Sequence, residues 1–255
     1  MEPVATLVLL PGLDGTDVFF RPLLALLPSS IQPRVIVFPT PNAGGYDELL
    51  QFVREVTADL PEFTIFASSF SGPLAIMLAA VEPERVKGII LCSTFVRAPK
   101  PGLPRYRFAM VPPVVWTLRA MRRLPVWLRR RDDPLRVAKA ETWSRVSAQA
   151  LAERGRAILE VDVRETLQNC PQPVLCLDFA DDQVVPRHNA EEICQLHLAA
   201  TMVTLPGGHF GMFTHPGPVA EQVVSFIGAN SKNPRPSINH PLNVSTPCSH
   251  GPVGR

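Results

Sequence analysis

Short apolar runs alternate with helical patterns along most of this chain. The runs predict strands at Ala5–Leu10, Arg34–Phe38, Phe63–Ala67, Val86–Cys92, Pro173–Asp178 and Thr201–Leu205. The segments between them predict helices at Phe19–Leu27, Tyr46–Leu60, Gly72–Val81, Arg187–His197 and Pro218–Ile227. Crossover helices cover both faces of a parallel sheet, so its strands are apolar nearly throughout. The sequence therefore predicts an α/β fold with a doubly wound, mostly parallel sheet.

The alternation stops between about residues 95 and 170. This interval has helical patterns, seven prolines and all three tryptophans, but no convincing strand. It is also basic: between Phe95 and Glu165 there are 16 Lys or Arg and 7 Asp or Glu, against 9 and 16 elsewhere. We interpret it as a helical cap inserted into a single domain of residues 1–229. Residues 230–255, with five prolines and few large apolar side chains, predict a disordered tail.

The composition narrows the classes of protein to consider. A chain of 255 residues with 46% hydrophobic content can bury a substantial core. The five cysteines are scattered without C-x-x-C spacing, so we expect neither a metal site nor a disulfide framework. The opening "MEPVATLVLLPG" lacks the basic start and the length of a secretory signal, which favours a cytoplasmic location.

Three serines stand where the third predicted strand passes into a helix, in "FTIFASSFSGPLA". At a strand-to-helix nucleophile elbow, the residues two before and two after the nucleophile press against neighbouring backbone and must be small. The flanking pairs are Phe66 and Phe70 for Ser68, Ala67 and Ser71 for Ser69, and Ser69 and Pro73 for Ser71. Only Ser69 has two small flanks that are not proline. We therefore predict that Ser69 is the nucleophile.

A serine nucleophile needs a base and an acid at the same edge of the sheet. His209 follows the last predicted strand through "LPGGH" and is the preferred base, while His215 stands just before the final helix. Asp178, Asp181 and Asp182 lie at the end of the fifth strand in "LDFADDQVVP". Asp182 is deepest in the loop and is modestly preferred on these grounds.

The first predicted strand ends in the glycine turn of "LVLLPGLDGT". A turn at this position can direct backbone N–H groups at the space above the elbow. We assign the predicted oxyanion donors to the backbone amides of Leu13 and Phe70, which together would stabilise a negatively charged tetrahedral intermediate.

From about Val4 to Ala229 the chain resembles the α/β-hydrolase superfamily. "LLPGLDG" is similar to its oxyanion loop, "ASSFSG" to its elbow, "FADDQVVP" to its acid loop and "GGHFGMFTHP" to its histidine loop. The resemblance implies the order nucleophile, acid, base, and it aligns Asp182 with the acid. The departures are Ala67, Ser71 and Phe179 in place of glycines and Pro11 in place of histidine. The resemblance also implies that two initial antiparallel strands are missing.

The resemblance implies a serine esterase or thioesterase that needs no cofactor and uses Ser69, Asp182 and His209. An acyltransferase with the same triad and a non-catalytic binding protein remain alternatives. The expected substrate is a small-molecule or carrier-linked acyl ester, as in the carrier-protein methyl esterases that the chain also resembles. The basic cap is either a helical lid with solvated arginines or a surface that attracts an acidic acyl carrier protein or an anionic membrane. No nucleic-acid partner is expected. The prediction of an anionic partner depends on the stretch from residue 105 to 131, which combines Arg105, Arg107, Met110, Trp116, Arg119, Met121, Arg122, Arg123, Trp127, Arg129, Arg130 and Arg131.

Overall fold

The computed structural model describes residues 4–39, 44–100, 102 and 133–232. Six strands form one sheet in the order β2-β1-β3-β4-β5-β6, and every neighbouring pair is parallel. The strands are β1 (Ala5–Leu10), β2 (Ile31–Val35), β3 (Phe63–Ser68), β4 (Val86–Cys92), β5 (Val174–Phe179) and β6 (Thr201–Leu205). The predicted parallel sheet is confirmed.

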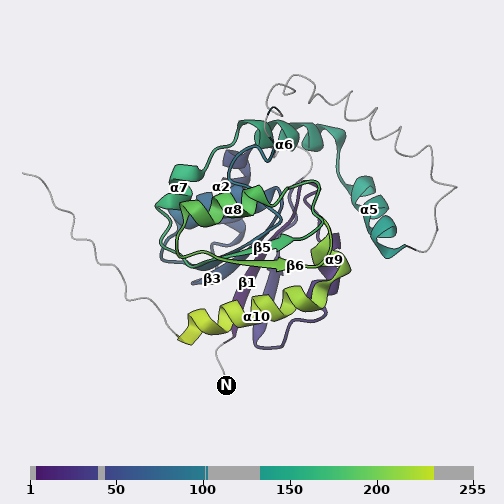
Figure 1. The fold of residues 1–255 in the computed structure, drawn as a ribbon. Helices are drawn as coiled ribbons and strands as arrows, with labels where there is room; N and C mark the ends of the chain where they lie inside the picture. The colour runs from purple at the N-terminus through teal and green to yellow at the C-terminus, as the bar shows by residue number, and fades with distance from the viewer. Residues whose placement is uncertain (1–3, 40–43, 101, 103–132, 233–255) are drawn as a thin grey trace, which may run out of the picture.

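Helices cover both faces of this sheet, which is the arrangement of a doubly wound fold (Figure 1). They are η1 (Val18–Phe20), α1 (Arg21–Leu24), α2 (Tyr46–Val56), α3 (Ser71–Val81), α7 (Arg164–Gln168), α8 (His188–Leu196), α9 (Gly211–Thr214) and α10 (Pro216–Lys232). One core cluster lies between the sheet and α2, α3, α7 and α8, and a second lies between the sheet and α1, α9 and α10. The central strands β3 and β4 are buried almost throughout, because their side chains enter both clusters.

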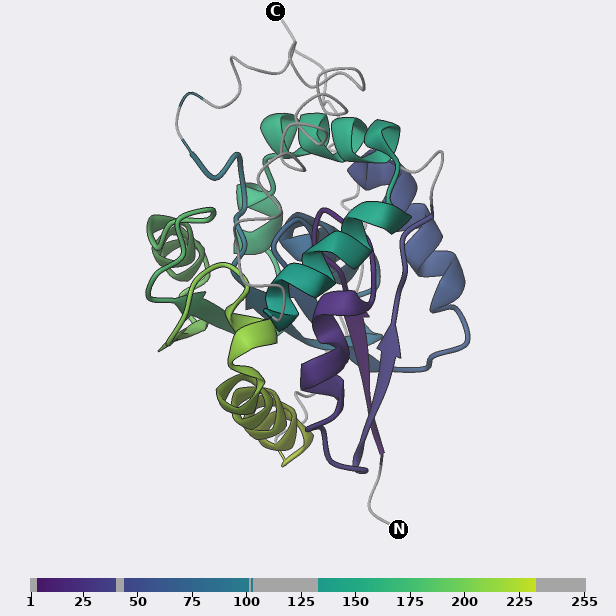
Figure 2. The same cartoon turned by 90° about the vertical axis from the view of Figure 1, so that its right-hand side faces the viewer.

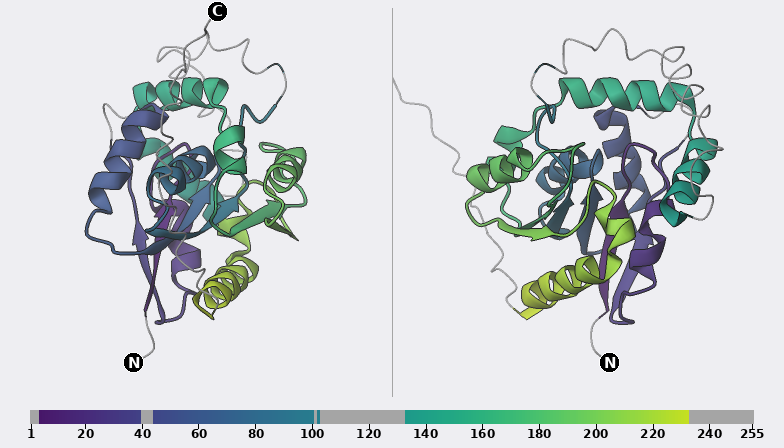
Figure 3. Two further views of the ribbon diagram at one scale, coloured as in Figure 1. Left: turned by 90° about the vertical axis from the view of Figure 1, so that its left-hand side faces the viewer. Right: turned by 45° about the vertical axis from the view of Figure 1, so that its right-hand side comes forward.

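Two further helices, α5 (Pro134–Arg145) and α6 (Ala148–Glu160), precede α7 between β4 and β5. The side chains of Asp133 and Ser147 accept hydrogen bonds from backbone amides in the first turns of α5 and α6, which fixes where each helix begins. Figures 2 and 3 show α6 at the end of the molecule opposite the N-terminus, past the carboxyl ends of the strands. The insertion therefore lies at the sheet edge where parallel folds bind ligands.

Several predicted bounds differ from the structure, among them the end of α2, which lies at Val56 rather than Leu60. The second strand covers Ile31–Val35 rather than Arg34–Phe38, so the apolar residues Ile36 and Phe38 are buried just beyond it. The helix expected at Phe19–Leu27 is a 3-10 turn followed by the single turn of α1. The last helix runs to Lys232, three residues past the predicted domain boundary, and residues 233–255 lie outside the described chain. Over the residues that are described, no helix is both long and apolar enough to cross a membrane.

Candidate active site

Ser69 lies on a sharp turn between β3 and α3. Its φ angle is +49°, a left-handed value that costs free energy for a residue with a side chain. The turn is held from both sides: the Ser69 amide donates to the carbonyl of Cys92 at 2.8 Å, and the Ser69 carbonyl accepts from the Gly72 amide and the Thr94 hydroxyl. The surrounding bonds thus hold the hydroxyl-bearing residue in a strained conformation, as a nucleophile elbow requires.

The small flanks of Ser69 are explained by packing. Ala67 and Ser71 are both fully buried. The Ser71 hydroxyl donates to the carbonyl of Pro11, so a serine in this position also ties the elbow to the loop after β1. At Gly72, by contrast, a Cβ atom would overlap the Thr94 side chain, lying 2.6 Å from its Cγ2 and 2.8 Å from its Cβ. The position that demands glycine is therefore three residues after the serine.

The structure brings the three predicted triad residues together in one chain of hydrogen bonds. The Ser69 Oγ lies 3.1 Å from Nε2 of His209, and Nδ1 of His209 lies 2.8 Å from Oδ2 of Asp182. An ionised carboxylate can only accept, so Nδ1 carries the proton and donates to Asp182. Nε2 is then free to accept the proton of the Ser69 hydroxyl.

Backbone amides hold the side chain of Asp182 in place. The side chain of Asp182 is only 1% exposed, and its Oδ1 accepts from the amides of Val184 at 2.8 Å and Val185 at 2.9 Å. Burial by itself raises the pKa of this carboxyl, but the hydrogen bond and charge of His209 and the two backbone amides outweigh burial, so the pKa lies below its usual value. Asp182 is therefore ionised while it orients the imidazole.

The alternative acids and base lie elsewhere. Asp181 is exposed, and its amide donates to the carbonyl of Gly207. His215 is exposed at the end of α9, where its Nδ1 lies 2.9 Å from the Thr214 hydroxyl. Asp178 belongs to β5 and is buried, which raises the pKa of its carboxyl. Its Oδ2 has no partner within the described residues.

The loop after β1 passes directly against the elbow. A Cβ atom on Gly12 would lie 3.9 Å from the Cβ of Ser69. The strand order places β1 and β3 side by side, although their following connections lead to opposite sides of the sheet, and ligands bind at such a switch point. Neither the Leu13 amide nor the Phe70 amide donates a hydrogen bond to any group in the described chain. Within the described residues, both predicted oxyanion donors are therefore without an internal acceptor.

The insertion covers this loop. Leu13 and Trp143 of α5 both pack against the small cluster formed by Val146, Ala150 and Leu151 at the junction with α6. On the other side of the site, the Phe210 ring lies edge-on to His209 at 5.5 Å, and Nζ of Lys139 lies 4.0 Å from the Phe210 ring centre. Among the described residues, this side of the site thus has the aromatic ring of Phe210 against His209, and the cation of Lys139 from α5 lies on that ring.

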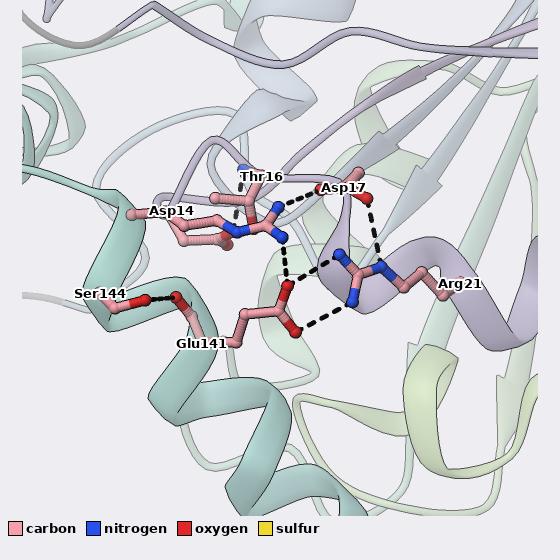
Figure 4. Close-up of polar contacts among 7 residues, drawn as sticks. Asp14, Thr16, Asp17, Arg21, Glu141 and Ser144 are labelled. Carbon is pink, nitrogen blue, oxygen red and sulfur yellow. Dashed lines mark hydrogen bonds and ion pairs between the residues drawn. The ribbon is translucent and has the colours of Figure 1, made fainter.

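Ionic contacts fasten α5 to the segment after the loop. Figure 4 shows Arg21 donating to both carboxylate oxygens of Glu141, at 2.8 and 2.9 Å, while it also contacts Asp17. Arg145 completes the set by pairing with Asp17 and Glu141. We call these four residues the charge clasp. All four are partly exposed, so the clasp positions α5 without contributing much stability.

Sequence analysis missed three residues around the site. Thr94 holds the Ser69 carbonyl, and Tyr46 donates to the Phe70 carbonyl at 2.8 Å and stacks on the Phe70 ring. Arg154 is fully buried against the loop after β1. Only Arg154 left a signal in the sequence, because it is a charged residue on the apolar stripe of α6, between Leu151 and Ile158. The eight cap arginines between residues 105 and 131, on which the partner prediction depends, lie in residues 103–132, outside the described chain, so their role stays a prediction.

Comparisons with known proteins agree with this fold. Residues 7–222 match the protein family described as "Alpha/beta hydrolase family". A hydrolase from Pseudomonas aeruginosa PA01 has a similar structure, with a TM-score of 0.73 and 20% identity over 88% of this chain and 90% of that one. An enol-lactonase from Burkholderia xenovorans LB400 has a TM-score of 0.73 and 18% identity, over 88% of this chain and 92% of that one. A thermophilic esterase from Thermogutta terrifontis has a TM-score of 0.73 and 18% identity, over 90% of this chain and 92% of that one. The comparison with curated proteins returns no match.

Proposed function

Because the chain belongs to the alpha/beta hydrolase family, we propose that it is a serine hydrolase that cleaves carboxylic esters or thioesters through an acyl-enzyme. One observation carries the proposal: the hydrogen bonds that run from the Ser69 hydroxyl through His209 to Asp182. This is the arrangement that activates a serine for attack on an acyl carbonyl.

In the proposed reaction, Oγ of Ser69 attacks the acyl carbon while its proton passes to Nε2 of His209. Asp182 stabilises the resulting imidazolium and keeps the ring in the orientation for transfer. The tetrahedral intermediate then collapses: the bond to the leaving oxygen or sulfur breaks, and His209 returns the proton to that atom. A water molecule then attacks the acyl carbon while His209 takes its proton. The bond between the acyl carbon and Oγ breaks, His209 returns the proton to Oγ, and the acid is released.

The negative oxygen of the intermediate needs donors close to Ser69. We assign this role to the amides of Leu13 and Phe70, which flank the nucleophile from two different loops. Their lack of other partners within the described chain supports the assignment. By analogy with single-donor deletions, each contributes roughly 3 kcal/mol to the stability of the transition state.

A fluorophosphonate probe tests the nucleophile. We expect mass spectrometry to locate the adduct on Ser69, and we expect Ser69→Ala to lose both labelling and turnover of p-nitrophenyl esters. Ser93→Ala is the matched control, because Ser93 also has a φ of +49° and also follows a central strand. Labelling that persists in Ser69→Ala, or that depends equally on Ser93, would refute the assignment.

Turnover of esters of graded chain length, alongside acyl thioesters, then defines the substrate class. Release of free acid in water supports hydrolysis, whereas transfer to an added alcohol in preference to water would identify an acyltransferase on the same triad. A protein with neither labelling nor turnover would be a binding protein, and that result would contradict the proposal.

A further inference from the structure

Arg154 occupies a position where a charged side chain is costly. It lies on α6, one turn from Leu151 and from Ile158, on the stripe that faces the core, and it is the largest fully buried side chain in the described chain. Burial lowers the pKa of its guanidinium to about 10, so the group remains protonated at neutral pH. A buried charge persists only where it satisfies other buried groups.

The carbonyls that Arg154 satisfies belong to the loop after β1 and to the segment after β2. Its Nη1 donates to the carbonyl of Leu13 at 3.0 Å, and its Nη2 donates to the carbonyl of Pro39 at 3.2 Å. The guanidinium also lies 5.3 Å from the ring centre of Phe38. Within the loop, Gly15 leaves room for this contact, since a Cβ atom there would lie 2.5 Å from Nη1.

The Leu13 carbonyl is one of several that hold the loop in shape. The Pro11 carbonyl accepts from Ser71, the Gly12 carbonyl accepts from the Gly15 amide at 2.9 Å, and the Gly15 carbonyl accepts from Phe38 at 2.9 Å. Arg154 is the one member of this set that comes from the insertion. The loop therefore depends on α6 for the bond at Leu13.

The hydrogen bond from Arg154 to the Leu13 carbonyl affects the direction in which the Leu13 amide points. In a trans peptide the N–H points away from the preceding carbonyl, so the Leu13 amide is directed opposite to the Gly12 carbonyl. The Gly12–Gly15 bond fixes the peptide plane before Leu13, and Arg154 fixes the plane after it. With both planes fixed, Leu13 cannot rotate about its Cα atom without breaking a buried hydrogen bond.

We propose that Arg154 is a positioning residue that sets the Leu13 amide for the oxyanion of the reaction. The inference rests on the proposed hydrolase function and goes beyond it, because it makes the helical insertion a part of the machinery that stabilises the transition state. Arg154 makes no hydrogen bond to Ser69, His209 or Asp182, and its proposed effect on the reaction passes through the Leu13 carbonyl.

The experiment compares Arg154→Met and Arg154→Lys with Arg85→Met. Arg85 is a matched arginine at the opposite end of the sheet: it donates to the carbonyls of Thr57 and Leu60 and lies 5.5 Å from the Phe63 ring centre. Each variant is measured for Tm, for kcat and KM with a p-nitrophenyl ester, and for inhibition by a trifluoromethyl ketone, which forms a tetrahedral oxyanion on the serine.

We expect Arg154→Met to lower kcat roughly 10- to 100-fold and to raise the inhibition constant by a similar factor, with KM little changed. Arg154→Lys should lose less, because it keeps the charge and can reach one carbonyl. Arg85→Met should lower Tm but keep kcat within about threefold of the wild type.

The inference would be overturned if Arg154→Met and Arg85→Met had the same kcat and the same inhibition constant, because an arginine with a purely structural role should change Tm alone. If Arg154→Met does not fold, Arg154→Lys decides: an unchanged inhibition constant refutes the role and a raised one supports it. The two proposals fail separately. A wild type without Ser69 labelling refutes the hydrolase itself, whereas an active wild type with unaffected Arg154 variants refutes the positioning role alone.

Discussion

Gly72→Ala should damage the elbow although alanine is the better helix former. A Cβ atom at this position would lie 2.6 Å from Cγ2 and 2.8 Å from Cβ of Thr94, so Thr94 or the first turn of α3 must move. Overpacking of this kind costs about 1–3 kcal/mol. Displacing Thr94 also breaks its bond to the Ser69 carbonyl, at about 1 kcal/mol, while the gain in helix propensity is at most about 1 kcal/mol. The net loss of about 1–3 kcal/mol should lower Tm by about 2–12 °C in a chain of this size.

Thermal melts and the rate of fluorophosphonate labelling test this expectation together. Gly228→Ala is the control, since nothing lies within 4 Å of a Cβ atom there, and its Tm should stay level or rise. Thr94→Ala removes Oγ1 and Cγ2, which both overlap the added Cβ atom. Gly72→Ala should therefore destabilise the Thr94→Ala variant less than it destabilises the wild type. The reasoning fails if Gly72→Ala is as stable as Gly228→Ala, or if its cost is the same in both backgrounds.

Two buried carboxyls near the site should respond to pH with opposite signs. Burial raises the pKa of Asp178, so its ionised form disfavours folding and Asp178→Asn should raise Tm at pH 7. The pKa of Asp182 is lowered, so its ionised form favours folding and Asp182→Asn should lower Tm at pH 7. Both differences should close in melts as the pH falls below about 4, and shifts of the same sign at pH 7 would contradict the assignment. In the charge clasp, Glu141→Gln weakens the contacts to Arg21 and Arg145, so hydrogen exchange in α5 should become faster at low salt and should lose its salt dependence. Exchange in α5 that is identical to the wild type would show that the clasp does not hold the helix.

The sheet could be predicted from the sequence because its strands are buried on both faces. The ranges predicted for β1, β4 and β6 are those observed. The prediction failed at β2, because an apolar run marks burial and not pairing. Ile36 and Phe38 are buried beyond the end of the strand, while Gln32 and Pro33 are paired with β1 and yet exposed.

The proximity of Ser69, Asp182 and His209 could also be predicted, since each follows a strand and the parallel sheet gathers strand ends at one edge. The choice of Asp182 over Asp181 needed the structure or the family resemblance, because the two are neighbours in one loop. The roles of Arg154 and Thr94 depend on contacts between segments far apart in the chain. No local pattern predicts which buried carbonyl an arginine will reach.

The proline in β2 has a consequence for self-association. β2 is an edge strand, and in the described chain it pairs only with β1. The Ile36 amide donates to Leu9 in β1, and alternate residues of a strand direct their amides to the same side, so the nitrogen of Pro33 faces the open edge. An extended segment from another molecule would find no donor at the centre of this edge. Pro33 therefore hinders strand addition between copies while the ladder to β1 stays unbroken.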